Sequence, residues 1–237
     1  MPYIVPIDFL QRVQPVHLTQ ITSADPRVIA DTLKIVVDDV RELLVQKYDM
    51  DRELTETESY DAAKIYPLPA RVYYTSGAAP NQTTDIYYAK LPAAEFDFRK
   101  TYRTGEFVFW IDRKYKALQA IPANGLNPDL IPDFWLPDVA ASTVAAGQIG
   151  DATKWIKGDN RCATLVSNMV DICLYHVYSR ISPNNVPVHR TDRHNAAVTW
   201  LQQAGTGDRT VNLPRLNPLK KGARIRSGSQ PKNINRY

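Results

Sequence analysis

Residues 161–180 read RCATLVSNMVDICLYHVYSR, and residues 187–204 read PVHRTDRHNAAVTWLQQA. In the first stretch apolar side chains recur every three or four positions from Leu165 to Val177, and in the second the same spacing leads to Trp200. This period predicts two amphipathic helices. Because only a short turn with Pro and Asn joins them, we expect an αα-hairpin whose helices are close neighbours.

An earlier segment adds a third long helix. Asp25 suits the N-cap and Pro26 the first helical position, and the helical spacing of apolar residues continues to about Tyr48. A short helix is expected before it, over residues 6–13, and the acidic stretch 49–61 is expected to be a helix end and a linker. Together these helices predict a three-helix body.

The character of the chain changes between residues 66 and 150. Four short aromatic and β-branched runs separated by turn residues predict small β-strands, at 71–75, 85–90, 106–111 and 115–120. Prolines then favour an extended, irregular course. The sequence thus predicts an α+β fold with three parts: a discontinuous helical domain (1–60 and 155–208), an inserted β-rich module (61–154) and an extended basic C-terminal arm (209–237).

Composition places the 237-residue chain among ordinary globular proteins, with 44% hydrophobic and 23% charged residues. No apolar run reaches the roughly 18 residues of a membrane span, and no signal-peptide pattern opens the chain. We therefore expect that the protein does not associate with a membrane and that it is made in a cytoplasm. Cys162 and Cys173 lie eleven positions apart in one predicted helix, too far for a disulfide, and are expected to be reduced.

Charge is distributed unevenly along the chain. The arm from Arg209 to Tyr237 holds eight Lys or Arg and no acid, whereas the preceding 208 residues hold 21 basic and 25 acidic side chains. Basic arms of this kind bind nucleic acid, acidic protein surfaces or anionic membranes.

Catalytic sites are often marked by motifs that bind phosphate or a metal or that supply an activated nucleophile. The sequence holds no Gly-rich phosphate loop, no Cys-x-x-Cys pair and no His-Glu-x-x-His. His189 and His194 lie five positions apart beside two arginines, which disfavours a shared metal. We expect no enzyme activity, no catalytic residue, no cofactor and no metal.

The C-terminal helices carry a resemblance to a known group. They are similar to the head-to-tail connector proteins of tailed phages, including the Mu-type head protein family, at Leu165, Met169, Ile172, Tyr175, His176, Tyr178, Arg180, Val186, Pro187, Arg190, Arg193, Ala196, Trp200, Leu201 and Gly205. The N-terminal helices fit the same pattern, so the resemblance covers residues 1–55 and 155–215. The insertion from about 60 to 155 departs from it.

The resemblance implies a structural virion protein at the head-to-tail junction, assembled in the host cytoplasm. Its subunits would form a homo-oligomeric ring, of dodecameric type, beneath the portal protein, contact tail or further ring proteins, and surround genomic DNA without sequence specificity. The C-terminal arm would grip the portal through Leu213, Arg215, Leu216, Leu219, Lys220, Lys221, Arg224, Ile225 and Arg226. Unbound, the arm is expected to be disordered.

The inserted module has a resemblance of its own. Its Tyr102-x-x-Gly105-Glu106 run and its later aromatics are similar to the small β-module of chitin-binding domains, which is reused in phage virion proteins. Trp110, Tyr115 and Trp135 are therefore candidates for docking a glycan or a protein, or else form the small core of the module.

Two other functions stay open from sequence. One is a nucleic-acid-binding phage accessory protein that uses the basic arm, for which a steep loss of affinity with salt would be diagnostic. The other is a virion glycan-binding protein that uses the inserted module.

Overall fold

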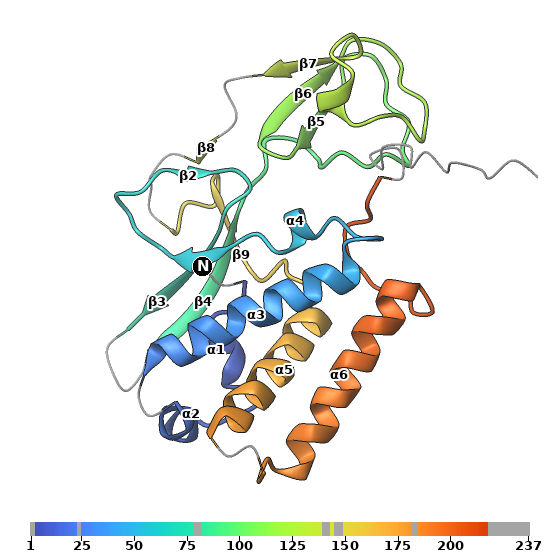
Figure 1. The fold of residues 1–237 in the computed structure, drawn as a ribbon. Helices are drawn as coiled ribbons and strands as arrows, with labels where there is room; N and C mark the ends of the chain where they lie inside the picture. The colour runs from blue at the N-terminus through green and yellow to red at the C-terminus, as the bar shows by residue number, and fades with distance from the viewer. Residues whose placement is uncertain are drawn as a thin grey trace, which may run out of the picture.

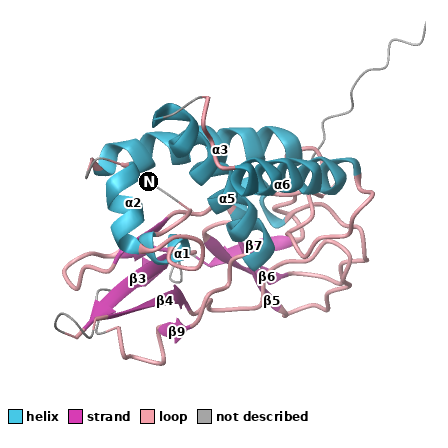
Figure 2. Cartoon of the chain, turned by 90° about the horizontal axis from the view of Figure 1, so that it is seen from below, coloured by secondary structure: helices cyan, strands magenta, loops and turns pink. Residues whose placement is uncertain are grey.

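The computed structural model describes residues 3–22, 25–77, 82–138, 143–144, 149–181 and 184–217. The fold is α+β, as predicted. Figure 1 shows the long helices packed side by side, with the strands beside and above them. Figure 2 views the chain from below, where the helices gather on one side and the strands on the other.

Six helices form one side of the molecule: α1 (Pro6–Phe9), α2 (Pro15–Ile21), α3 (Pro26–Leu44), α4 (Met50–Glu53), α5 (Ala163–Ile181) and α6 (Val188–Thr206). The three long helices lie where the apolar period predicted them, and the Asp25 side chain accepts a hydrogen bond from the backbone N–H of Arg27 at 2.9 Å, as expected of an N-cap. The first predicted helix is shorter than expected. Helix α2, which we had not predicted, begins with Pro15 at its first turn, a position that suits proline.

The helices share one apolar core. It draws side chains from both ends of the chain, among them Phe9, Val36, Val40, Leu44, Leu165, Met169, Leu174, Leu201 and Leu213. The contact between α3 and α6 is close, because a Cβ added to Gly205 would lie 2.5 Å from the carbonyl oxygen of Leu43.

The strands form two main sheets and one short pair. The larger sheet has the order β1-β3-β4-β9 and the smaller has the order β5-β6-β7, while β2 pairs with β8. Their bounds are β1 (Thr57–Ser59), β2 (Tyr66–Pro67), β3 (Arg71–Ser76), β4 (Thr83–Ala89), β5 (Phe107–Trp110), β6 (Arg113–Ala117), β7 (Trp135–Asp138), β8 (Thr143–Val144) and β9 (Trp155–Lys157), and a 3-10 turn covers Pro128–Leu130. The four predicted strands correspond to β3, β4, β5 and β6.

The two edge strands of the larger sheet come from the segments that connect the module to the helices. Strand β1 runs parallel to β3 and leads in from α4, while β9 runs antiparallel to β4 and leads out to α5. The expected linker after α4 therefore includes a strand. As a result, the segments that lead into and out of the inserted module are both hydrogen-bonded to strands of the module.

A buried ion cluster fixes the start of α5 against the N-terminus. The guanidinium of Arg161, whose side chain is fully buried, donates to both carboxylate oxygens of Asp8 at 2.7 and 2.8 Å and to the carbonyl oxygen of Tyr3 at 2.8 Å. Asp159 holds its other edge, with Nη2 donating at 2.7 Å. Such a two-sided pairing supplies partners for both charges, which a buried ion pair requires.

We predict that Arg161→Gln strongly destabilises the chain, because it leaves the carboxylate of Asp8 buried without its cation. The expected loss in the free energy of unfolding is about 3–5 kcal/mol, measured by urea denaturation. Arg113→Gln is the matched control, since Arg113 lies on the surface with only Asp112 at 3.6 Å, and it should cost at most about 1 kcal/mol. Equal losses in the two variants would contradict the structural role of the cluster.

We also predict that Gly205→Ala weakens the packing of α6 on α3. The added methyl group meets backbone, which cannot rotate away, so the overpacking cost of about 1–3 kcal/mol should exceed the gain in helix propensity. Gly150→Ala serves as the control, because nothing lies within 4 Å of its added Cβ. A thermal unfolding midpoint for Gly205→Ala at or above that of the unchanged chain would refute the close contact.

Candidate functional site

The first part of the C-terminal arm lies on the body of the protein. Residues 209–217, here called the strap, run along the end of α3 (Figure 1). Asp49 donates its backbone N–H to the carbonyl oxygen of Pro214 at 2.8 Å, and Leu216 donates to the carbonyl oxygen of Lys47 at 2.9 Å. The side chain of Leu213 is buried in the helical core. The expectation of a free arm from Arg209 onward is therefore wrong for the strap, whose backbone and Leu213 find partners within the chain.

The strap also reaches the β-rich part. At its end the side-chain amide of Asn217 donates to Oδ1 of Asn127 at 2.7 Å, beside the 3-10 turn. The strap thus contacts the helical unit at one end and the smaller sheet region at the other. Besides the buried Leu213, these connections come from backbone and amide groups, which the alternating apolar pattern of the arm did not indicate.

The predicted portal-binding residues separate into two sets. Within the strap, Leu213 is buried and unavailable to a partner, Leu216 is half-buried, and Arg215 is exposed. The other predicted residues, Leu219, Lys220, Lys221, Arg224, Ile225 and Arg226, lie outside the described residues. They belong to residues 218–237, here called the tail, which hold six basic side chains and no acid.

The aromatic candidates of the module are core residues. Trp110, Tyr115 and Trp135 are all buried, and Trp135 packs edge-on against Phe96 and Tyr102 with ring centroids 5.8 and 5.5 Å apart. The indole N–H of Trp110 donates to Asp129 at 2.8 Å. A glycan cannot stack on rings that are packed inside the module, so the docking role predicted for Tyr115 and Trp135 is wrong, while Trp110 is also buried but lines the cavity described below. Each lies on the inner face of its strand, as the alternative interpretation held.

Two histidines of the helical unit, His176 and His194, line a hollow of about 990 Å³ between α3, α5 and α6. The rings of His176 and His194 are 5.9 Å apart, and Tyr175 stacks on His194 at 4.0 Å. Burial, with a contribution from His194, lowers the pKa of His176, whereas Asp39 acts in the opposite direction. The described residues contain no group of three or more His, Cys, Asp or Glu able to hold a metal ion.

Both cysteines are free, as the sequence predicted. Burial raises the pKa of the Cys173 thiol to about 12, and burial also raises the pKa of Cys162. A thiol needs a lowered pKa to act as a nucleophile near neutral pH. Neither cysteine has the environment of a reactive thiolate.

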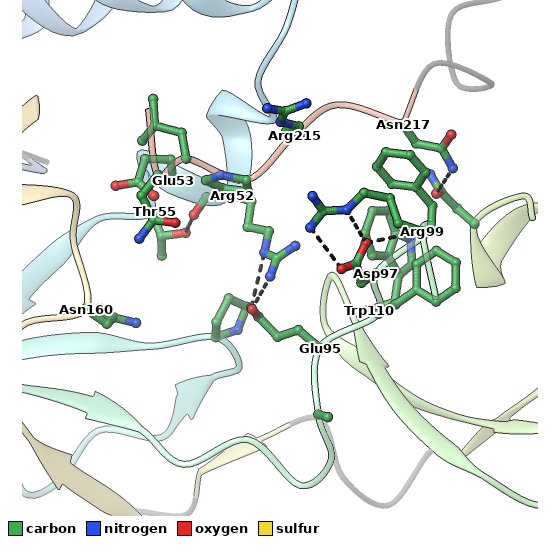
Figure 3. A pocket seen from close by; sticks show the side chains of 18 of the residues that line it. Arg52, Glu53, Thr55, Glu95, Asp97, Arg99, Trp110, Asn160, Arg215 and Asn217 are labelled. Carbon is green, nitrogen blue, oxygen red and sulfur yellow. Dashed lines mark hydrogen bonds and ion pairs between the residues drawn. The ribbon is translucent and has the colours of Figure 1, made fainter. Parts of the chain in front are cut away.

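Another cavity lies beneath the strap, with a volume of about 880 Å³. Its walls come from α4 and the residues after it, the segment 94–100 that precedes β5, and the strap itself (Figure 3). Its charged lining residues are Arg52, Glu53, Arg71, Glu95, Asp97, Arg99, Lys100 and Arg215. We had not predicted this cavity, because its walls are far apart in the sequence and none of them carries a recognisable motif.

Comparison with known proteins adds no relative: no protein-family model, no curated protein and no solved structure matches the chain. Within the part of the chain that the structure describes, no helix has the length and apolar character to cross a membrane.

We predict that Trp135 stabilises the module and binds no glycan. Trp135→Ala removes a fully buried ring and should lower the free energy of unfolding by about 3–5 kcal/mol in a denaturant titration followed by fluorescence. Leu136→Ala is the control on the opposite face of the same strand, where the side chain is 53% exposed, and should cost at most about 0.5 kcal/mol. Retention of the unchanged chain on chitin, lost in a Trp135→Ala protein that stays folded, would restore the glycan interpretation.

Proposed function

We propose that this chain is a structural virion protein, a head-to-tail connector subunit that forms a ring under the portal and links the capsid vertex to the tail. The observation that carries the proposal is the relation between the body and the tail. Among the described residues the helical core ends with Leu213, and Asn217, the residue before the tail, is held by a hydrogen bond to Asn127. A cationic segment that leaves from a fixed point suits a grip on an acidic partner surface.

The arrangement of the helices supports the same proposal. Helices α3, α5 and α6 come from the two separated segments that resemble connector proteins, and they pack on one another as a single unit. The β-rich part lies to one side of the helical unit and does not separate the long helices from one another (Figure 2). A connector subunit with an added module requires this separation.

One end of the helical unit offers surface for a neighbouring subunit. The start of α6, the end of α5 and helix α2 lie at the same end of the unit (Figure 1). These elements and the turn after α1 expose Leu10, Val16, Ile181 and Val188. Elements at one end of a unit that expose apolar side chains provide surface for protein contacts, and a closed ring needs two different faces on each subunit. We infer that this end takes part in ring contacts.

The proposal includes the remaining partners. Genomic DNA passing through the ring would meet basic side chains without sequence-specific contacts, and tail or further ring proteins would bind the side away from the portal. The role is structural, with no catalytic step. The alternative that the tail favours is a nucleic-acid-binding accessory protein, because six cations without an acid also suit phosphate backbones.

The test is to mix the purified protein with the portal protein encoded beside it and to measure the mass of the complex. We predict a discrete multi-copy complex for the full chain. Replacing Lys220, Lys221, Arg224 and Arg226 by Gln should weaken binding at least tenfold, about 1.4 kcal/mol, because the tail would lose four of its six cations.

A chain that ends at Asn217 separates the tail from the body. It keeps the strap, so its unfolding midpoint should equal that of the full chain, whereas its portal complex should be lost. A chain ending at Asp208 is a poorer choice, because it also removes Leu213 from the core. No portal complex, together with DNA binding by the full chain that falls steeply with salt, would replace the connector proposal with the accessory protein.

A further inference from the structure

The cavity under the strap carries more positive than negative charge. Its lining includes five cationic and three acidic side chains. Arg71 and Glu53 form its buried back wall: Arg71 donates to the carbonyl oxygen of Thr55 at 2.9 Å and to Asn160 at 2.8 Å, while Glu53 accepts from the hydroxyl of Tyr3 at 2.6 Å. The charges of Arg71 and Glu53 offset each other, so the excess positive charge comes from the other lining residues.

Two arginines face the cavity with part of their donor capacity unused. Arg99 donates from Nε and Nη2 to the carboxylate of Asp97, both at 2.9 Å, and Arg52 binds Glu95 through the same two nitrogens (Figure 3). The described residues offer no acceptor to Nη1 of either guanidinium. Each arginine is therefore oriented by a carboxylate and still presents an amino group, an arrangement that pre-organises a site for an anion.

Two further cations at the cavity form no salt bridge with the residues described. Lys100 and Arg215 line the same cavity, and neither forms an ion pair within the described ranges. Arg215 reaches it from the strap and Lys100 from the segment before β5. Cations from three separate segments thus surround one space, which raises the local positive potential in a partly enclosed site.

A buried amide supplies an independent indication of a ligand. Asn127, which is 1% exposed, lines the cavity, and its Nδ2 finds no acceptor among the residues described. Its Oδ1 is occupied by Asn217. Buried donors are normally satisfied, so an unsatisfied one in a cavity wall indicates an acceptor that arrives from outside the chain.

We propose that this cavity binds a small molecule that carries a diphosphate group, either free pyrophosphate or a nucleoside diphosphate. A diphosphate provides several oxygens in different directions, which matches donors from Arg52, Arg99 and Arg215 better than a single carboxylate would. The volume of about 880 Å³ lies within the range of small-molecule sites and leaves space for a group attached to the phosphates. The site is distinct from the tail and does not depend on the connector proposal.

The experiment is calorimetric titration of the full chain with pyrophosphate, with adenosine diphosphate and with citrate at equal ionic strength. We expect saturable binding with one site per chain for pyrophosphate or adenosine diphosphate, and the tighter of the two identifies the source of the diphosphate. Arg99→Gln and Arg215→Gln should each weaken that binding about tenfold or more, because each removes a charged donor.

Two controls separate the cavity from other cations. Lys220→Gln combined with Lys221→Gln removes charge from the tail, and Arg113→Gln removes it from the smaller sheet, so both should leave the affinity unchanged. Arg99 and Arg215 are exposed, and equal unfolding midpoints would show that their variants fold. The proposal is overturned if neither diphosphate saturates, if citrate binds as tightly, if the tail variant abolishes binding, or if both cavity variants bind like the unchanged chain.

Discussion

The pairing of Arg161 with Asp8 and Asp159 is the constraint on which the remaining structure depends. It joins the first turn of the described chain to the point where β9 ends and α5 begins, across more than 150 residues of sequence. Because the charges of Arg161 and Asp8 are buried, they are stable only in one mutual arrangement. That arrangement sets the position of α5, against which α3 and α6 pack, and Glu53 extends the same network by accepting from the backbone N–H of Cys162 at 3.0 Å.

The strap gives the two halves of the molecule a shared boundary. It covers the end of the helical core with Leu213 and reaches the smaller sheet region through Asn217, so the space between them becomes a partly enclosed cavity. Carboxylates and guanidinium groups in that cavity hold one another in place. Removing one member of such a pair costs free energy, because the other is left without its partner. The strap, which the sequence predicted to be part of a free arm, therefore forms one wall of this cavity.

The sequence predicted the elements whose signal is local. The helical period gave α3, α5 and α6 nearly to their ends, and β-branched and aromatic runs gave β3 to β6. It missed β1 and β9, because three-residue strands have no period and form only where β3 and β4 offer an edge. It also left open which face of each aromatic strand is covered, since alternation distinguishes two faces but does not say which is buried. The cavity could not be predicted from the sequence, because its walls meet only after folding.

The way in which the strap is attached determines how the protein responds to tension. A pull applied through the tail reaches Asn217 first, then the hydrogen bond between Leu216 and Lys47, then that between Pro214 and Asp49, and last the buried side chain of Leu213. Load would therefore be released in small steps before it reached α6. The strap can therefore detach and extend under tension while the helices keep their packing.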